Sequence, residues 1–205
     1  NAAISLYDKV SKNITEDYYK QVNQVPLGDV CQSMCYFNNK FYIVVNNSSK
    51  VVVVNAATFK IEATISGFNS PRYILPVSNS KAYVSDLYDN RLAIVNLSTN
   101  SISGYIPAVA GTEQLKMVYG KVFVSSLFTD KIYVINAMTD MLTDSIALAY
   151  SPNSICEDKN GLLWVMCSGD SLQQKPSALM QINPMNNQVL KSFYFNGKHA
   201  PWRMN

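Results

Sequence analysis

The stretch GKVFVSSLFTDKIYVINAMTDMLTDSI, residues 120–146, decides the fold because its pattern occurs again along the chain. It contains a lysine, an apolar and aromatic run, several polar turn residues, a basic residue and a second apolar run that ends in asparagine. The same order appears in SKAYVSDLYDNRLAIVNLSTNSISGYI, residues 80–106, and in NKFYIVVNNSSKVVVVNAATFKIEATI, residues 39–65. A fourth copy, with a longer central loop, is NGLLWVMCSGDSLQQKPSALMQINPMNNQVLKSF, residues 160–193.

The copies recur at a nearly constant period. The asparagines that end the second run lie 41, 40 and 47 residues apart, at Asn55, Asn96, Asn136 and Asn183. Self-similarity at such a period is the signature of a repeat architecture. Three of these asparagines are followed by a threonine three residues later: Thr58, Thr99 and Thr139. Because both side chains can cap their own turn, we predict a structural turn here in preference to a ligand contact.

The composition of each copy indicates four short β-strands, A to D, joined by tight turns. Runs rich in Val, Ile, Tyr and Phe alternate with Asn, Asp, Ser, Thr and Gly, and no segment shows a sustained helical period. The middle runs, such as residues 51–54, are apolar without a break, which indicates burial of both faces of the sheet. Repeated units of this kind predict an all-β fold: a β-propeller of four-stranded antiparallel blades with a repeat of about 40 residues.

We predict a single β-propeller domain over residues 1–205, with four to five blades visible. Residues 1–25 are expected to form the outer strands of a first blade, and residues 199–205 the start of a further blade. A chain that stops inside a strand leaves an apolar edge unpaired, so we expect a fragment of a longer ring. The blades between these ends are predicted at residues 30–66, 70–107, 111–147 and 152–194.

The composition and charge of the chain argue against some classes of binding partner. Hydrophobic residues make up 48% of the chain and charged residues 15%, as is ordinary for an all-β protein with a core. The net charge of +3 is spread without a basic block, so we expect neither a nucleic acid nor an anionic membrane as partner. The longest apolar runs are far shorter than the roughly 20 residues of a membrane span. We expect an exported protein whose targeting segment is not in this sequence.

The cysteines do not form a recognisable metal site. Cys31 and Cys35 are four residues apart, Cys156 and Cys167 follow more than 100 residues later, and the lone His199 has no partner in the sequence. An even number of cysteines in an exported protein permits a disulfide, with Cys156 and Cys167 the nearest pair. A turn near residues 159–160 would instead place Cys156 opposite Leu163, which favours buried free thiols.

Catalysis finds little support in the sequence. The single histidine removes the usual general base for a serine or cysteine nucleophile, and no nucleophile elbow, glycine-rich phosphate loop or calcium loop is present. The two acids of CEDKNG, residues 156–161, belong to a hairpin turn signal. We therefore predict that the protein is not an enzyme and carries neither cofactor nor metal.

Aromatic residues recur at one position of strand B and are predicted to pack between blades, because a buried aromatic contributes a large contact area: Tyr42, Tyr83, Phe123 and Trp164. Two further aromatics, Tyr88 and Phe128, hold equivalent places in the B–C loops one blade apart. Exposed aromatics on loops often mark recognition surfaces, but these two rings can also fold back over the blade edge.

Ligand binding is therefore predicted on the end of the blades where the D–A and B–C loops meet, around the central channel. Residues expected near the channel mouth are Gln32, Arg72, Glu113, Gln114, Asn153, Trp202 and Arg203. Residues expected on the B–C rim are Asn47, Tyr88, Phe128 and Asp170.

The repeated pattern K-x-Y/F-V-S followed by K/R-x-x-V-I/V-N-x-x-T resembles the YVTN-type propeller repeats of surface-layer-like proteins. NAAISLYDKVSKNITEDYYKQVNQVPLGDVCQSM, together with FYIVVNNSSKVVVVNAATFK, resembles the start of a bacterial surface lipoprotein group built on that propeller. The resemblance covers essentially the whole chain. It implies a seven-bladed ring, a place beside an outer-membrane uptake transporter and, for some members, cobalamin binding.

Two functions follow from these observations. The first is a cell-surface or periplasmic binding protein that captures a nutrient, such as a corrinoid or another metal chelate, and passes it to an outer-membrane transporter. The second is a structural or adhesive surface module that binds protein or glycan. A deep channel mouth lined by Arg72, Gln114 and Trp202 would favour the first, and a flat mouth the second.

Overall fold

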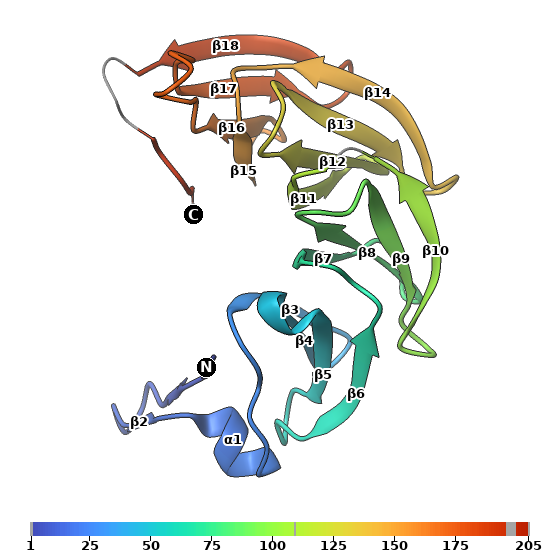
Figure 1. Ribbon diagram of the computed structural model, residues 1–205, viewed down its shortest axis with the longest axis vertical. Coiled ribbons are helices and arrows are strands. Elements are labelled where there is room, and N and C mark those ends of the chain that lie inside the picture. Colours follow the sequence, from blue (N-terminus) through green and yellow to red (C-terminus); the bar gives the residue numbers. More distant parts are fainter. Residues whose placement is uncertain (1, 109, 196–199, 205) are drawn as a thin grey trace. The chain divides into compact units, whose positions relative to one another are not determined.

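A computed structural model describes residues 2–108, 110–195 and 200–204 (Figure 1). Four antiparallel sheets of four strands each dominate it, and within each sheet neighbours in sequence are neighbours in space.

Blade 1 contains β3 (Cys31–Phe37), β4 (Lys40–Val45), β5 (Lys50–Asn55) and β6 (Ile61–Ser66). Blade 2 contains β7 (Pro71–Pro76), β8 (Lys81–Asp86), β9 (Arg91–Asn96) and β10 (Ser101–Pro107). Blade 3 contains β11 (Thr112–Val118), β12 (Lys121–Ser126), β13 (Lys131–Asn136) and β14 (Met141–Ala147). Blade 4 contains β15 (Pro152–Glu157), β16 (Leu163–Cys167), β17 (Ala178–Asn183) and β18 (Gln188–Tyr194). These are propeller blades, so the predicted fold class is confirmed.

The chain divides into two compact units. Unit 1 consists of Asn1–Val84 and Ala93–Gly104, and unit 2 of Ser85–Leu92 and Tyr105–Asn205. In unit 1 the first strands β3 and β7 pack against each other, and in unit 2 β11 packs against β15. The single domain remains a prediction.

Blade 1 is buried on both faces, as its unbroken run of valines predicts. Val51 and Val53 point into a cluster shared with blade 2, whereas Val52 and Val54 point into a second cluster on the opposite face. That second cluster contains Tyr19 and Leu27 from the N-terminal part of the chain.

The N-terminal region, where outer strands of a first blade are predicted over residues 1–25, contains two short strands and one helix. The strands β1 (Leu6–Tyr7) and β2 (Ile14–Thr15) pair with each other, and their place in a blade stays a prediction. The helix α1 (Tyr18–Asn23) is not predicted from the sequence. The helix has only six residues, too few to display a helical period in the sequence. It stays helical because Tyr19 is almost fully buried against blade 1.

The turn between the third and fourth strands is closed in the same way in every blade. The side-chain oxygen of the asparagine that ends the third strand accepts backbone N–H groups two and three residues later. In blade 3, for example, Asn136 Oδ1 lies 2.9 Å from Met138 N and 3.2 Å from Thr139 N. The same two bonds begin at Asn55 and Asn96, and Asn183 Oδ1 accepts the N–H of Met185, two residues later, at 3.0 Å. The prediction of structural turns is confirmed.

Blade 1 departs from the others at the residue that follows this turn. Asn100, Asp140 and Asn187 occupy the left-handed region in blades 2 to 4, with φ of 49°, 59° and 61°. Blade 1 places Phe59 there, at φ 58°. Asn and Asp tolerate this conformation, but for a bulky residue it costs about 1–2 kcal/mol. The side chain of Phe59 must therefore make contacts that offset this cost.

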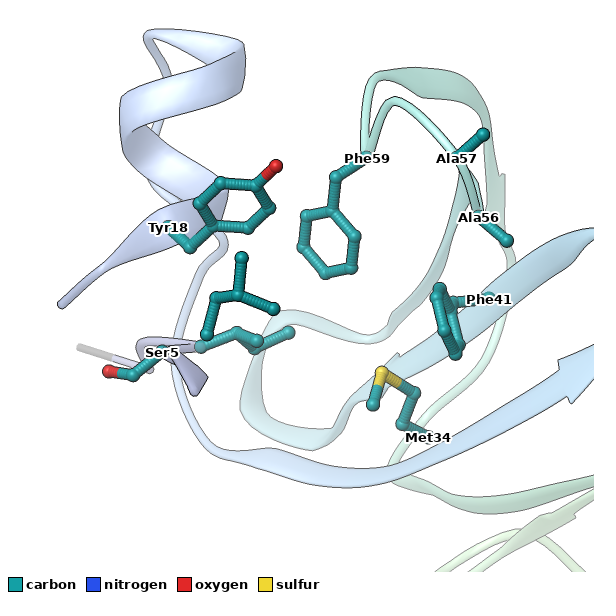
Figure 2. A pocket seen from close by; sticks show the side chains of 9 residues that line it. Ser5, Tyr18, Met34, Phe41, Ala56, Ala57 and Phe59 are labelled. Carbon is teal, nitrogen blue, oxygen red and sulfur yellow. The ribbon is translucent and has the colours of Figure 1, made fainter. Parts of the chain in front are cut away.

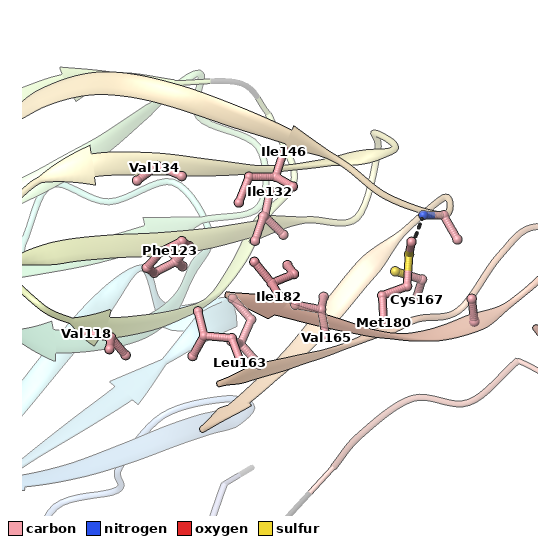
Figure 3. Close-up of a cluster of buried hydrophobic side chains, with 13 residues drawn as sticks. Val118, Phe123, Ile132, Val134, Ile146, Leu163, Val165, Cys167, Met180 and Ile182 are labelled. Carbon is pink, nitrogen blue, oxygen red and sulfur yellow. Dashed lines mark hydrogen bonds between the residues drawn. The ribbon is translucent and has the colours of Figure 1, made fainter. Parts of the chain in front are cut away.

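Unit 2 has its own core between blades 3 and 4 (Figure 3). Phe123 is fully buried, and Leu163 and Val165 of blade 4 belong to the same cluster. Tyr42 and Tyr83 are also buried, which confirms the predicted core role of three of the four strand-B aromatics. The fourth, Trp164, is only half-buried. It stacks on Phe193 with ring centroids 6.1 Å apart and donates a hydrogen bond of 3.0 Å to Asp158.

All four cysteines are free thiols. Cys156 lies opposite Trp164, one residue away from the predicted Leu163, and Cys167 lies opposite Pro152. Only Cys167 is fully buried, and burial raises the pKa of its thiol to about 12. Burial also raises the pKa of the half-buried Cys31 and Cys35.

Candidate functional site

Four of the residues predicted near the channel mouth lie at irregularities of the innermost strands. Gln32 falls at a register shift between Cys31 and Ser33 of β3. Glu113 and Gln114 fall at the equivalent shift in β11. Asn153 falls at the shift in β15. Such β-bulges leave a residue outside the strand pairing and re-aim its side chain.

In unit 2 these side chains hold the scaffold together. Gln114 Oε1 accepts the backbone N–H of Ile155 at 2.7 Å, which links the innermost strands of blades 3 and 4. Asn153 Nδ2 donates to Ser168 Oγ and, at 3.1 Å, to the carbonyl of Pro201. The side-chain oxygen of Asn153 is buried without a hydrogen-bond partner. Glu113 is also buried.

In unit 1, Gln32 and Arg72 are both half-buried on neighbouring strands. Ser33 Oγ donates a 2.7 Å hydrogen bond to the carbonyl of Arg72, so the backbones of β3 and β7 approach closely here. Asn47 is exposed in the 3₁₀ turn Asn46–Ser48 and donates to Asp29 Oδ2 at 3.2 Å.

The C-terminal residues 200–204 run beside β15 without forming a strand. Met204 N donates to Ser154 Oγ at 3.1 Å, and Ser168 Oγ donates to the carbonyl of Pro201 at 2.6 Å. Trp202 and Arg203 are exposed on this segment. His199 lies outside the described residues.

The B–C loops of blades 2, 3 and 4 all belong to unit 2 and are fixed by backbone hydrogen bonds to the D–A connections. The N–H of Gly111 donates to Leu87 O, and its carbonyl accepts the N–H of Leu127, both at 2.8 Å. One blade further, Ser151 N donates to Thr129 O at 2.8 Å and Ser151 O accepts Ser168 N at 2.9 Å. A rigid scaffold that carries loops in this way is a common setting for a binding site.

The two predicted rim aromatics behave differently. Tyr88 is 63% exposed, and its N–H donates to Asp86 Oδ1 at 3.1 Å. Phe128 is 49% exposed because one side of its ring lies on Gly111. A Cβ at Gly111, where φ is +81°, would lie 2.7 Å from the ring, so glycine is required there. Phe128 thus folds back in part over its own loop.

The long B–C loop of blade 4 is organised by Asp170. Its backbone N–H and C=O pair with those of Lys175 at 2.9 and 2.8 Å, and Asp170 Oδ1 accepts the N–H groups of Leu172 and Gln173. Gly169 N donates to the carbonyl of Tyr150 at 2.9 Å. The closed loop holds the Lys175 ammonium 3.7 Å from the centre of the Tyr150 ring. Asp170 therefore positions a cation beside an aromatic ring.

A cavity of about 320 Å³ opens beside this pair, and we call it the unit 2 cavity. Its lining combines one cation, one carboxylate, two tyrosines and three smaller apolar residues: Lys175, Asp130, Tyr150, Tyr194, Leu148, Ala149 and Pro176. None of the predicted site residues lines it, although Asp170 holds Lys175 in place. The unusual length of the blade 4 loop is the sequence signal that points to this place.

A second cavity, of about 340 Å³, lies in unit 1 between the N-terminal segment and blade 1 (Figure 2). We call it the unit 1 cavity. It is lined by Ile4, Ser5, Leu6, Tyr18, Met34, Phe41, Ala56, Ala57 and Phe59. Sequence reasoning missed it entirely, and the aromatic residue at position 59, where the other copies have Asn or Asp, is the signal that could have found it.

Among residues 2–108, 110–195 and 200–204, no group of three or more His, Cys, Asp or Glu side chains is placed to bind a metal ion. The helices of this described part of the chain include none with the length and apolar character needed to cross a membrane.

Solved structures with the same fold support the propeller assignment. A quinonprotein alcohol dehydrogenase-like protein from Bacteroides thetaiotaomicron is 13% identical, with a TM-score of 0.73 over 95% of this chain and 49% of that chain. Virginiamycin B lyase from Staphylococcus aureus is 12% identical, with a TM-score of 0.73 over 97% of this chain and 65% of the lyase. Hydrazine synthase from Kuenenia stuttgartiensis is 15% identical, with a TM-score of 0.69 over 82% of this chain and 48% of that chain.

The chain thus spans about half to two thirds of the length of these structures. No curated protein sequence matches it. The propeller part of the sequence resemblance is confirmed, whereas the lipoprotein group is not shown.

These comparisons overturn the prediction that the protein is not an enzyme. Structures with the same fold include a lyase and a synthase, so a propeller fold gives no ground for excluding catalysis. At 12 and 15% identity the likeness concerns the fold alone.

At the level of sequence families the match is nearly complete. The family described as "Domain of unknown function (DUF5074)" matches residues 1–202, and the chain belongs to this family.

Proposed function

We propose that the protein binds a small molecule on the loop face of unit 2, with the unit 2 cavity as the recognition site. The loop face consists of the B–C loops 87–90, 127–130 and 168–177 and the D–A connections 110–111 and 148–151. The observation that carries this proposal is the convergence of Lys175, Asp130 and Tyr150, on loops that backbone hydrogen bonds hold in place, with Tyr194 at the end of β18.

The chemistry of the lining suits a ligand with both flat apolar surface and polar groups. Small-molecule sites are usually concave, with aromatic walls and a few polar groups that fix orientation. Tyr150 and Tyr194 offer rings, Lys175 offers hydrogen-bond donors and Asp130 offers acceptors. The Asp170–Lys175 pairing holds the ammonium before any ligand arrives, which lowers the ordering cost of binding.

The resemblance to the surface lipoprotein group suggests the biological setting. In this proposal the protein stands at the cell surface or in the periplasm, captures a nutrient such as a corrinoid or another metal chelate, and passes it to an outer-membrane transporter. A cavity of about 320 Å³ is at the small end of the range for ligand sites. A corrinoid would therefore insert one edge and lie across the exposed rim beside Phe128.

A calorimetric titration with cobalamin and with cobinamide tests the proposal, using Tyr194→Ala and the control Tyr119→Ala. Tyr194 lines the cavity, whereas Tyr119 lies in the β11–β12 turn, at the other end of its blade, and both are exposed. Losing an aromatic wall should weaken binding roughly tenfold or more in the first variant and leave it unchanged in the second.

The two parts of the proposal fail in different ways. Saturable binding that both variants retain equally would place the ligand elsewhere and remove the site. If the wild-type chain binds neither compound, the corrinoid assignment is wrong, and a screen of other metal chelates on the same two variants decides whether the cavity binds ligands.

A further inference from the structure

Phe59 is the residue in blade 1 that breaks the rule of the repeat. Three blades place Asn or Asp at this left-handed position, and blade 1 places an aromatic ring there at φ 58°. Strained backbone of this kind persists only where its surroundings over-determine it, and it gathers at functional sites. The residues around Phe59 are therefore a candidate functional site.

Two elements hold Phe59 in place. Its ring lies 5.3 Å from the Tyr18 ring and 5.8 Å from the Phe41 ring, centre to centre. Its carbonyl accepts a 3.0 Å hydrogen bond from Asn23 Nδ2 at the end of α1, and Asn23 Oδ1 accepts the N–H of Ile61 at 2.9 Å. The helix thus fixes both the backbone and the side chain of this turn.

The rings of these residues form one side of the unit 1 cavity. Figure 2 shows Tyr18, Phe59 and Phe41 in a row, with Met34 beside Phe41, and the hydroxyl of Ser5 directed away from them. Neighbouring rings are tilted by 45° and 57° rather than stacked, so the cavity presents both ring edges and ring faces. No side chain in the lining carries a charge.

We propose that the unit 1 cavity is a binding site for the neutral, planar aromatic group of a small molecule. A volume of about 340 Å³ is at the lower end of the range for ligand sites and suits a group of one to three rings. Aromatic edges and faces favour offset and edge-to-face contact with a further ring, and the thioether of Met34 adds a favourable sulfur–aromatic contact. The uncharged lining disfavours an ionic ligand, because a charge would be buried without a partner.

This site does not depend on the function proposed above. Its lining belongs entirely to unit 1, and the loop face belongs to unit 2. The two cavities also favour different ligands, because a cation and a carboxylate line the unit 2 cavity whereas no charged side chain lines the unit 1 cavity.

A fluorescence titration with the neutral probe N-phenyl-1-naphthylamine, in competition with naphthalene, tests the proposal on three variants. Met34 is 50% exposed at the cavity, so Met34→Lys places a charge in the lining without removing core contacts, and Met34→Leu keeps the site apolar. Met138→Lys is the matched control, because Met138 is 88% exposed and does not line this cavity. Met34→Lys should raise the probe's Kd roughly tenfold or more, and the other two should leave it within about twofold.

A loss of affinity in a variant must be distinguished from a loss of its fold. Thermal unfolding of each variant shows whether it is folded, and the methyl resonance of Met34 in the wild type should shift on adding naphthalene. Equal affinity in Met34→Lys and wild type, or an unmoved methyl resonance at saturating naphthalene, would overturn the site. Sedimentation that shows dimers dissociating as probe binds would also overturn it, since a second copy would then be the occupant.

Discussion

The two cavities have nearly equal volumes, about 340 Å³ in unit 1 and 320 Å³ in unit 2, but opposite linings. The unit 1 cavity has no charged side chain, whereas the unit 2 cavity contains Lys175 and Asp130. Both arise where one copy departs from the repeat. Blade 1 has Phe59 in place of Asn or Asp, and blade 4 has a long B–C loop where the others have a short one.

The difference separates two kinds of residue in a repeat protein. Positions that all copies share, such as the asparagines that close the turns, keep the blade folded. Where one copy deviates from the others, its backbone is strained or its loop is longer, and either change lowers the stability of the fold. Such a change persists only where another contact compensates for it. Function is therefore expected at the deviations.

The largest expected effect comes from breaking the loop that forms the unit 2 cavity. A Cβ on Gly169 would lie 2.5 Å from Lys175 O and 2.6 Å from Ser177 N, both backbone atoms, at a φ of +69°. Gly169→Ala should lower the free energy of unfolding of unit 2 by about 3 kcal/mol, from left-handed strain plus overpacking. Urea unfolding followed by tryptophan fluorescence measures it, because both tryptophans lie in unit 2.

The matched control is Gly120→Ala. Gly120 has nearly the same φ, +73°, but a Cβ there meets no atom within 4 Å. Only the conformational cost of about 1 kcal/mol remains. Equal losses of unfolding free energy in the two variants would show that the B–C loop of blade 4 shifts to accommodate the added Cβ. The closed form of that loop would then not be what shapes the unit 2 cavity.

The next effect tests the strained turn of unit 1. Phe59→Ala and Phe59→Gly both lose the ring contacts, but only alanine keeps the cost of the left-handed backbone. We expect the glycine variant to be more stable than the alanine variant by about 1 kcal/mol, the reverse of the order elsewhere in regular structure. Hydrogen exchange of the β5 and β6 amides reports on this turn directly. The ordinary order, with alanine more stable, would mean that the turn relaxes once the ring is gone.

The features that could be predicted from the sequence are those that depend on the repeat alone. The repeat is a property of the chain alone, so blades, turn-closing asparagines and the buried Tyr42, Tyr83 and Phe123 follow from it. Trp164 holds the same place in its copy but is only half-buried, because burial also depends on what packs against the sheet. Periodicity contains no information about that neighbour.

The candidate sites were less accessible to sequence reasoning. Loop residues could be assigned to one end of the blades, but which side chains converge depends on loop closure in three dimensions. Asp170 was selected as a ligand contact, yet its bonds go to its own loop, and Lys175, which it positions, was missed. The helix α1 is too short to show a period in the sequence, so its contribution to the unit 1 cavity, through Tyr18, could not be predicted.

A smaller effect concerns the cation of the unit 2 cavity. The Lys175 ammonium over the Tyr150 ring should contribute about 0.5–1 kcal/mol to the stability of unit 2. A double-mutant cycle with Lys175→Met and Tyr150→Leu isolates this coupling, because methionine keeps most of the apolar stem. A coupling energy of zero would show that the loop, and not the ring, holds Lys175 in place.

The smallest effect lies in the scaffold, away from both cavities. The hydrogen bond from Trp164 Nε1 holds the pKa of Asp158 below its ordinary value, with further contributions from the backbone N–H groups of Leu162 and Asn160. A carboxylate with a depressed pKa contributes stability that is complete above its ordinary pKa and is lost as the pH falls through the folded pKa. In a Trp202→Phe background, the fluorescence of Trp164 should therefore change only at a pH below the ordinary range of aspartate. Asp158→Asn should abolish that change while Asp130→Asn preserves it, since Asp130 lies on the loop face. A transition that survives in Asp158→Asn would assign the acid sensitivity to another carboxylate and leave the stacking of Trp164 on Phe193 as its main anchor.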